Sequence, residues 1–295
     1  MNQLHRVAVL DLGAMGHAFC TNLLKHQFTT FGWNRSKSRG EDLVAFGLQL
    51  ADNVEDAVKE ADVILTMLAN GEVTQQVVTS ILSTLPEKAI IVQMATIGIE
   101  TIQQLMTLIA RLRPDVSFID APVSGTKTPA EQAQITILAS GDTACAPRLE
   151  PIFNAISKST RWLGPCGMGS RMKLVVNAWL IAMMQGVAES TSLAAKLGFS
   201  PEDFWSVLDG GPLAAPYIKG KLSMIATEDY TPQMQLTHAL KDVNLALQAA
   251  PETTLPVLQT IATLWQQAVT EGYGEQDLSV IYQYISQDST SLPEK

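Results

Sequence analysis

The sequence predicts a two-domain α/β protein, with a doubly wound parallel sheet in the first half and an all-α domain in the second. A length of 295 residues corresponds to about two domains of ordinary size. Short β-branched segments alternate with helical segments as far as Leu163, as in βαβ units on a parallel sheet. After residues 164–167 the strand signals stop. We therefore expect one domain at residues 1–164 and a second at residues 165–295.

The predicted strands are short runs rich in Val, Ile, Leu and Thr. The helical segments between them have recognisable starts, because Asn53 and Asn70 each precede acidic residues, as an N-cap with acids in the first turn does. A helix is expected at Met15–His26, directly after a Gly-containing turn. The strands are expected at Val7–Leu10, Thr29–Trp33, Val63–Met67, Ala89–Gln93, Ser117–Asp120, Ile135–Ser140 and Thr160–Leu163.

The second half begins with a long predicted helix, Met168–Leu197, which has Gly198 as its expected C-cap. Its most apolar part, Leu174–Ala188, is shorter than the roughly 20 residues that a membrane-spanning helix needs. It is also interrupted by polar residues. We therefore expect a buried helix of a soluble protein, and no membrane partner. The five tryptophans of the chain are most simply core residues.

Composition and charge exclude several classes of protein. Hydrophobic residues make up 46% and charged residues 17%, which is typical of an ordinary globular protein. Twenty Lys and Arg against 29 Asp and Glu give a formal net charge of −9, so the basic surface that nucleic acid requires is not expected. The three cysteines are scattered, which predicts neither a disulfide framework nor a metal site. This usage suits the cytoplasm.

The first functional pattern is a strand, a glycine turn and a helix near the N-terminus. Gly13 and Gly16 stand where the second and third glycines of the dinucleotide-binding pattern GxGxxG lie. The second glycine lets the backbone approach a pyrophosphate, and the third lets the helix pack closely on the strand. Asp11 replaces the first glycine and brings a carboxylate near the expected pyrophosphate. The segment still predicts a dinucleotide site.

The end of the second predicted strand indicates which dinucleotide is bound. The pattern expects an acid there to bind the ribose hydroxyls of NAD, but this chain has Asn34 followed by Arg35 and Ser36. Asn34 removes the carboxylate that would repel a 2′-phosphate, and Arg35 can pair with that phosphate. These residues predict NADP as the cofactor. The alternative is a solvated arginine in a polar loop.

Two further segments carry candidate chemistry. Ser124 and Gly125 follow a strand, so they should lie at the carboxyl edge of the sheet, where a hydroxyl and an amide could hold a substrate carboxylate, although a plain turn would have the same sequence. On the long helix, Lys173 and Asn177 project from one face. Either Lys173 reaches water or a carboxylate, or both residues face a cleft between the domains and Lys173 acts as a proton donor. An adjacent pair such as Lys241 and Asp242 is usually a surface pair.

Together these segments resemble the β-hydroxyacid dehydrogenase family. They recur in family order and cover the chain from Val7 to about Ala250. The resemblance implies an N-terminal Rossmann domain, a long interdomain helix and an all-α C-terminal domain like that of 6-phosphogluconate dehydrogenase, which supports a homodimer or homotetramer. The segments are Leu12–Gly16, Trp33–Ser36, Asp120–Gly125, Gly167–Asn177 and Lys241–Asp242.

The resemblance also implies roles by position. Lys173 would be the catalytic acid/base, with Asn177 beside the substrate. Substrate binding would further involve Ser124, Gly125, Thr126, Met234 and Lys241. The cofactor would be bound by Leu12, Gly13, Ala14, Met15, Gly16, Asn34, Arg35, Ser36, Leu68, Ala69, Thr96, Lys241 and Asp242.

Within the family, Trp33–Ser36 and Ser124–Glu131 look most like the glyoxylate and succinic semialdehyde reductase branch. This implies NADPH-dependent reduction of a small aldehyde acid. Met234 departs from the branch, which usually has Phe there, so the substrate stays open. The alternatives are a 3-hydroxyisobutyrate or tartronate semialdehyde type of dehydrogenase, an imine reductase, and a non-catalytic NADP-binding module.

Overall fold

The structure is a computed structural model that describes residues 6–288, and its backbone contacts divide the chain into two compact units. The first unit ends at Lys173 and the second begins at Leu174. This division falls inside a long helix, a few residues after the boundary expected from the sequence. Within residues 6–288 no helix is both long and apolar enough to cross a bilayer.

The first unit is built on a six-stranded parallel sheet with the strand order β3-β2-β1-β4-β5-β6. Five of its strands agree with the predicted ones to within a residue. The sixth, β3, has two residues, which is too short for a recognisable hydrophobic pattern. The strands are β1 (Arg6–Leu10), β2 (Thr29–Trp33), β3 (Gln49–Leu50), β4 (Val63–Thr66), β5 (Ile90–Gln93) and β6 (Ser117–Asp120).

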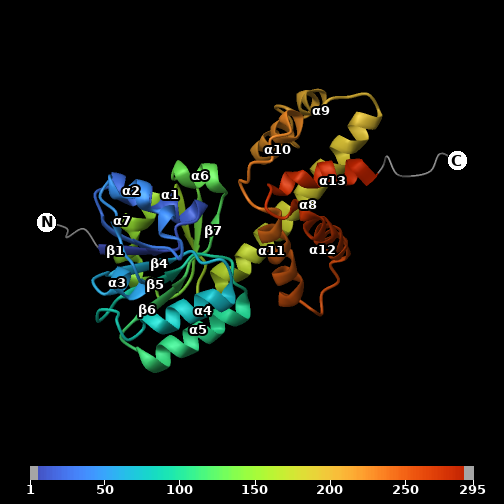
Figure 1. Cartoon of the computed structure of the whole chain (residues 1–295). Coiled ribbons are helices and arrows are strands. Elements are labelled where there is room, and N and C mark those ends of the chain that lie inside the picture. The colour runs from blue at the N-terminus through green and yellow to red at the C-terminus, as the bar shows by residue number, and fades with distance from the viewer. Residues whose placement is uncertain (1–5, 289–295) are drawn as a thin grey trace. The chain divides into compact units, whose positions relative to one another are not determined.

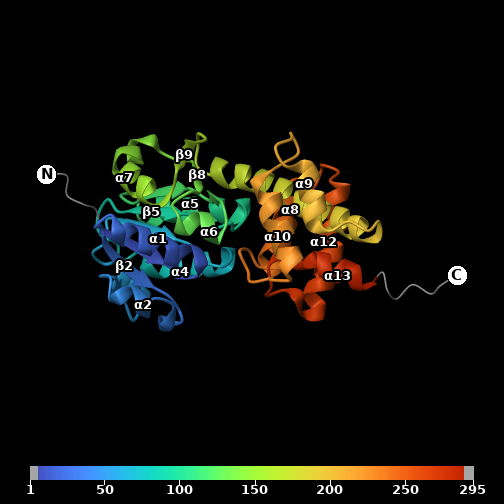
Figure 2. The ribbon, with the colours of Figure 1, turned by 90° about the horizontal axis from the view of Figure 1, so that it is seen from above.

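Helices cover both faces of this sheet, as Figures 1 and 2 show. Successive side chains of a strand point to opposite faces, so Val7 and Val9 pack into one core while Ala8 and Leu10 pack into the other. The near-continuous apolar strands follow from this double burial. One face carries α1 (Ala14–Lys25), α6 (Lys127–Glu131) and α7 (Ala146–Ile156), and the other carries α3 (Val54–Val58), α4 (Gly71–Ile81) and α5 (Ile99–Leu112).

A second, three-stranded sheet lies in the same unit, and here the expectation of a single parallel sheet is wrong. Its order is β7 (Val123–Ser124), β8 (Thr136–Ala139) and β9 (Ser159–Trp162). β7 is antiparallel to β8, while β8 and β9 are parallel. The chain reverses after β7, where Gly125 has a φ of +140°. Two residues of strand before such a turn leave no alternating pattern to predict.

The helix ends agree with their sequence signals. The Asn53 side chain accepts a hydrogen bond from the N–H of Asp56, and Asn70 accepts one from the N–H of Val73 at 2.9 Å. The long helix α8 spans Met168–Lys196. Gly198 follows it with a φ of +87°, the left-handed conformation of a glycine C-cap. The predicted N-caps and the predicted long helix are therefore confirmed.

The N-terminus of α8 is held by a buried carboxylate at the end of β6. Asp120, which has no exposed surface, accepts hydrogen bonds from the N–H and the hydroxyl of Ser170 at 2.8 and 2.7 Å. The hydroxyl of Ser140 accepts one from the N–H of Gly169 at 2.9 Å and donates one to Asp120. These bonds satisfy N–H groups that have no partner within a helix. They fix where α8 begins relative to β6 and β8.

The second unit is all-α, as the sequence predicts. Its core surrounds Trp265, which is fully buried and donates from Nε1 to Oε1 of Gln185 on α8 at 2.8 Å. Besides the rest of α8 it contains α9 (Pro201–Leu208), α10 (Pro216–Thr227), α11 (Leu236–Ala249), α12 (Pro256–Ala268) and α13 (Ile281–Asp288), with a short π-helix η3 (Val269–Tyr273) and a 3-10 helix η4 (Leu278–Val280).

The expectation that all tryptophans are core residues is wrong for Trp179. Its side chain is 68% exposed, and it belongs to an apolar stripe along α8 that also includes Met168, Met172 and Val175. These positions recur at the spacing of one helix face. An apolar pattern in the sequence indicates that a helix face is buried, but it does not show whether the residues that bury it belong to the same chain.

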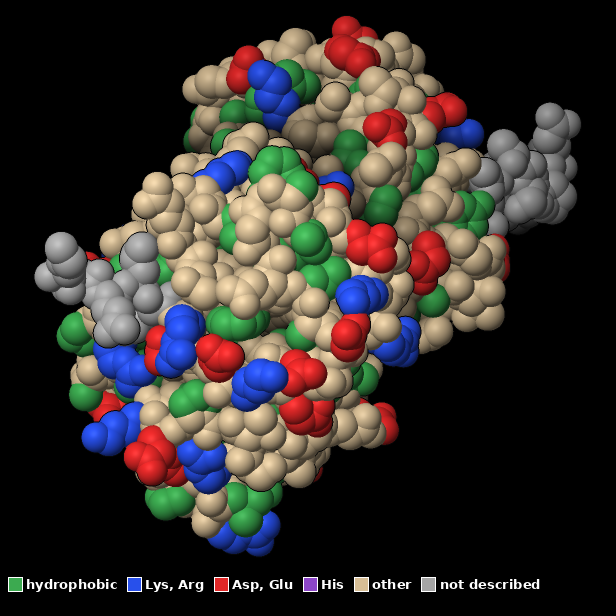
Figure 3. Space-filling view, turned by 60° about the vertical axis from the view of Figure 1, so that its left-hand side comes forward, with side chains coloured by type: hydrophobic (Ala, Val, Ile, Leu, Met, Phe, Trp, Pro, Cys, Tyr) green, Lys and Arg blue, Asp and Glu red, His purple; other side chains and the backbone are tan. Residues whose placement is uncertain are grey.

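Charged side chains of both signs are interspersed on the face shown in Figure 3. The acidic side chains divide the positive charge on this face into small patches. Ion pairs of the first unit include Arg113 with Asp115 at 2.8 Å and Lys59 with Asp56 at the same distance. Such surface pairs add little stability.

The buried position of Asp120 leads to a prediction about stability. In Asp120→Ala, the N–H and the hydroxyl of Ser170 lose their acceptor inside the protein, and the hydroxyl of Ser140 keeps only the backbone carbonyl of residue 120 at 3.0 Å. We expect the free energy of unfolding, measured by urea denaturation, to fall by about 2 to 4 kcal/mol. The control is Asp142→Ala, which removes an exposed cap on the N–H of Ala144 and should cost about 1 kcal/mol. Equal losses of unfolding free energy in Asp120→Ala and Asp142→Ala would contradict the larger contribution expected from the buried carboxylate.

Candidate functional site

The glycine turn lies at the carboxyl end of β1, where the strand order changes direction. β1 pairs with β2 on one side and with β4 on the other. The chain leaves β1 through Asp11 and enters α1 at Ala14. Open α/β sheets bind ligands at such a point, because the loops that leave the two central strands separate there.

The backbone of this turn explains both glycines. A Cβ atom at Gly16 would lie 1.8 Å from the carbonyl oxygen of Asp11, so α1 could not pack on this turn with any other residue. Gly13 is the N-cap of α1. α1, which lies wholly in the described part of the chain, has no side-chain cap and no acid in its first turn. Its N-terminal amides and positive dipole end therefore suit a pyrophosphate.

Asp11 occupies the position of the missing glycine in a glycine-like conformation. Its φ is +80°, which aspartate tolerates better than most residues. Burial raises the pKa of its carboxyl group, while Arg39, the N–H of Gly13 and Arg35 act in the opposite direction. The carboxylate thus lies against the turn and is partly balanced by arginines of the loop after β2.

Asn34 links this loop to the glycine turn. Its Oδ1 accepts a hydrogen bond from the N–H of Leu12 at 2.9 Å, and its Nδ2 donates to the carbonyl of Ser36 at 2.8 Å. Arg35 and Ser36 are exposed. Lys37, the next residue along the chain, pairs with Asp52. Asn34 is therefore a positioning residue that holds Arg35 beside the turn.

The loops after β4 and β5 carry the other predicted cofactor residues. Leu68 is buried and Ala69 exposed after β4, and Thr96 is half-buried after β5. Gln93, which the sequence analysis did not single out, shapes these loops: its amide accepts from the N–H of Ala95 at 3.0 Å and donates to the same residue's carbonyl at 2.6 Å. The sequence signal that could have identified Gln93 is a glutamine at the end of an apolar strand, because a buried amide group needs hydrogen-bond partners.

The Ser124–Thr126 turn follows β6 at the same edge of the sheet, as expected. A Cβ atom at Gly125 would lie 2.6 Å from Cγ2 of Ile135, so packing and backbone conformation both require glycine. Ser124 is half-buried in β7. Thr126 precedes α6 without capping it through its side chain. The turn is thus a constrained feature that fixes the backbone around two hydroxyl groups.

In the second unit, α8 and α11 share a buried polar contact. Nδ2 of Asn177 donates to Oδ2 of Asp242 at 2.6 Å, and the two residues are only 1% and 3% exposed. The neighbouring Lys241 has its Nζ 3.0 Å from Oδ1 of Asp242, but that oxygen makes no hydrogen bond. The expectation of a surface pair is therefore wrong for Asp242, because α11 turns this side chain toward α8.

Each unit thus gathers its own share of the predicted residues. In the first unit, the predicted residues follow neighbouring strands of one parallel sheet, so they lie at one edge of it. They are the glycine turn, Asn34–Ser36, Leu68–Ala69, Thr96 and the Ser124 turn. Lys173, half-buried, ends the first unit. Asn177, Lys241 and Asp242 cluster in the second. Met234 is half-buried in the segment before α11.

Comparison with known proteins identifies the family. Residues 6–164 match the NAD binding domain of 6-phosphogluconate dehydrogenase, and residues 167–285 match the family described as NAD-binding of NADP-dependent 3-hydroxyisobutyrate dehydrogenase. Glyoxylate/succinic semialdehyde reductase 1 of Arabidopsis thaliana is 32% identical over 95% of this chain and 98% of its own length.

Solved structures share the fold. 3-Hydroxyisobutyrate dehydrogenase from Salmonella typhimurium has a TM-score of 0.88 at 23% identity and covers 95% of this chain and 99% of its own. An imine reductase from Pseudomonas sp. has a TM-score of 0.64 at 23% identity, covering 96% and 100%. The resemblance expected from the sequence is confirmed: the chain belongs to the β-hydroxyacid dehydrogenase family of NAD(P)-dependent oxidoreductases, which includes 3-hydroxyisobutyrate dehydrogenase.

Proposed function

We propose that this enzyme uses NADPH to reduce a small aldehyde acid, of the glyoxylate or succinic semialdehyde type, to the hydroxy acid. The observation that carries the proposal is the buried Asn177–Asp242 contact, which fixes the face of α8 on which Lys173 lies one turn earlier. The Arabidopsis relative, which is named for both of these substrates, supports the choice of substrate class.

The residues at the sheet edge fit a dinucleotide phosphate. The uncapped N-terminus of α1 would hold the pyrophosphate, and Arg35 with Ser36 would hold the 2′-phosphate. The family resemblance assigns Lys241 and Asp242 to the nicotinamide end, and Nζ of Lys241 lies 3.0 Å from Oδ1 of Asp242. When bound, NADPH supplies the hydride.

The side chains supply the proton and the substrate contacts. The Lys173 ammonium stabilises negative charge on the carbonyl oxygen and donates a proton to it. Asn177 holds the geometry of this helix face through Asp242. Ser124 and Thr126 offer hydroxyl donors to the substrate carboxylate, and the N–H of Gly125 adds a third. Lys241 is assigned to positioning, because the family resemblance places it beside the cofactor rather than on the reacting oxygen.

The direct test follows NADPH consumption by absorbance with a panel of small aldehyde acids and cyclic imines. Reduction of an aldehyde acid supports the proposal, and reduction of an imine alone supports the imine reductase alternative. Binding of NADPH without any turnover supports a non-catalytic module. Tartronate semialdehyde belongs in the panel, because it separates the dehydrogenase alternative from the reductase.

The cofactor assignment predicts a selective effect of Arg35→Ala. Loss of a charged hydrogen bond of about 1.5 to 3 kcal/mol should weaken NADPH binding by about 10- to 150-fold and leave NADH binding nearly unchanged. Fluorescence titration with both cofactors measures this difference. Arg111→Ala, at an exposed arginine in the last turn of α5, serves as the control. Equal losses for both cofactors in Arg35→Ala would contradict the assignment.

The mechanism predicts that Lys173→Ala lowers the turnover number by about 10²- to 10⁴-fold with NADPH binding nearly intact. The lost group is the proton donor, so steady-state kinetics should show the loss in kcat. Lys196→Ala, in the last turn of the same helix, is the matched control. If Lys173→Ala kept normal turnover and lost only stability, Lys173 would be a structural residue.

We further propose a homodimer or homotetramer, in which a second copy covers the apolar stripe of α8. Val175 and Trp179 are 64% and 68% exposed, and side chains of this kind are commonly buried in oligomer interfaces. Sedimentation at micromolar concentration should give a species larger than the 31.9 kDa chain. Trp179→Glu should shift it toward monomer, whereas Val207→Glu, at an exposed site on α9, should not. A wild-type monomer would contradict the proposal.

A further inference from the structure

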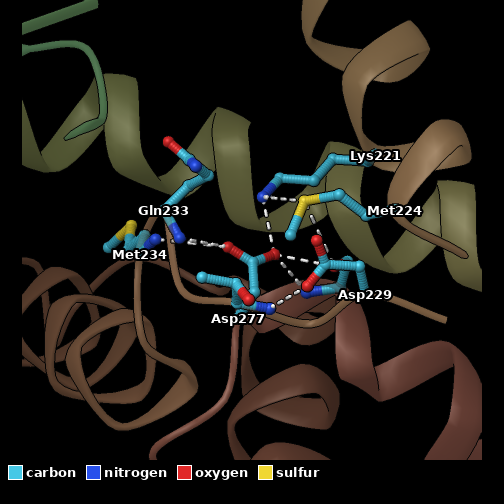
Figure 4. A network of polar contacts seen from close by, with 8 residues as sticks. Lys221, Met224, Asp229, Gln233, Met234 and Asp277 are labelled. Carbon is cyan, nitrogen blue, oxygen red and sulfur yellow. Dashed lines mark hydrogen bonds and ion pairs between the residues drawn. The ribbon is translucent and has the colours of Figure 1, made fainter. Parts of the chain in front are cut away.

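A buried ion pair lies in the second unit, apart from the residues that the proposed mechanism uses. Nζ of Lys221, on α10, is 2.6 Å from Oδ1 of Asp277, and the two side chains are 5% and 0% exposed. Figure 4 shows them pointing toward one another. The Lys221 ammonium also lies 5.6 Å from the ring centroid of Tyr217, one turn earlier on α10.

Asp277 uses both carboxylate oxygens to hold backbone. Oδ2 accepts hydrogen bonds from the N–H groups of Gln233 at 2.9 Å and Met234 at 3.2 Å. Oδ1 accepts from the N–H and the hydroxyl of Ser279 at 3.0 and 2.7 Å. Figure 4 shows the contacts to Gln233 and Met234. One carboxylate therefore ties two separate stretches of the chain together.

The stretch that contains Met234 is residues 228–235, which connects α10 to α11 without forming a helix or strand of its own. Backbone bonds from the Asp277 region complete the attachment: the N–H of Asp277 donates to Tyr230, and that of Leu278 donates to Met234 at 3.0 Å. α11, which carries Lys241 and Asp242, begins directly after this connecting segment. Its start is therefore tied to Asp277 as well.

The ammonium of Lys221 supplies the counter-charge of the Asp277 carboxylate. A buried carboxylate without a counter-charge is costly. Burial lowers the pKa of Lys221, whereas Asp277 acts to raise it. Removing the ammonium would leave an uncompensated charge inside the protein, so the carboxylate would be displaced from the N–H groups of Gln233 and Met234.

We propose that Lys221 and Asp277 are positioning residues that fix Met234, and thereby set which aldehyde acids the enzyme accepts. The inference rests on the proposed function and on the family resemblance, which assigns Met234 to substrate binding. The ion pair acts through the backbone of the connecting segment. Substituting either partner should therefore change selectivity among aldehydes of different length while NADPH binding is preserved.

The test compares Lys221→Met, which keeps the length of the side chain without its charge, with Asp277→Asn, which replaces one acceptor oxygen by a donor. The double variant removes both charges, and it serves if Lys221→Met alone does not fold. Lys221→Arg keeps the charge and should retain wild-type selectivity. Gln185→Leu is the matched control, because it removes another buried hydrogen bond of the same unit, to Trp265.

Two measurements are made on each variant that folds. In hydrogen exchange, the amides of Gln233 and Met234 should exchange at least about 10-fold faster in Lys221→Met and Asp277→Asn, because their acceptor is displaced. In kinetics, the ratio of kcat/KM for glyoxylate to that for succinic semialdehyde should change by about 10-fold. Gln185→Leu should lower stability but change neither quantity.

The outcomes separate this inference from the proposed function. If the wild-type enzyme reduces both aldehydes and the charge-removing variants keep the wild-type ratio, the ion pair is only structural and the inference is overturned. If the wild-type enzyme reduces neither aldehyde, the proposed function fails, and the selectivity role fails with it. In that case, faster exchange at Gln233 and Met234 would still support the positioning of the segment by Asp277.

Discussion

The buried carboxylate of Asp120 connects the parts of the first unit on which the rest of the structure depends. Asp120 ends β6, exchanges backbone hydrogen bonds with Ser140 after β8, and caps α8 through Ser170. The chain that leaves it leads directly to the Ser124 turn. One residue therefore sets both the start of the helix that carries Lys173 and the start of the predicted substrate loop. Burial raises the pKa of Asp120, and the hydrogen bonds from Ser170 and Ser140 oppose this shift.

Asp277 is the corresponding buried carboxylate of the second unit, and it has a different set of partners. Both acids are fully buried, and both accept backbone N–H groups. Asp120 faces the N-terminus of a helix, whose dipole favours a negative charge. Asp277 is also an N-cap, because its Oδ1 accepts from the N–H of Ser279 at the start of η4, but it has the ammonium of Lys221 beside it as well. Its Oδ2 in addition holds the backbone of Gln233 and Met234.

Asp242 differs from both, because one of its buried oxygens makes no hydrogen bond and lies 3.0 Å from Nζ of the adjacent Lys241. Its counter-charge thus comes from the next residue along the chain, while Nδ2 of Asn177 donates to the other oxygen. In the first unit, the half-buried carboxylate of Asp11 lies against a turn suited to a pyrophosphate. Arg35 and Arg39 offset part of that negative charge. This turn thus combines strict backbone geometry with a charge that is only partly balanced.

The sequence by itself determined the features that are local along the chain. Short-range hydrophobic pattern and backbone chemistry predict these features. They include strands such as Thr29–Trp33, the caps at Asn53 and Asn70, the long helix from Met168 and the glycine turn. The sheet edge that gathers the predicted cofactor residues follows too, because loops after parallel strands emerge on one side. The family and its NAD(P) dependence rest on these same segments.

Only the tertiary structure decided which polar side chains meet across long distances in the chain. Three pairs of buried partners are each separated by at least fifty residues along the chain, and no periodicity in the sequence links such partners. The pairs are Asp120 with Ser170, Asn177 with Asp242, and Lys221 with Asp277. The two-residue β7, the exposure of Trp179 and the burial of Asp242 depend on what packs against each segment. Propensity and pattern describe a residue's own element, whereas burial and pairing are set by the neighbours that the whole fold supplies.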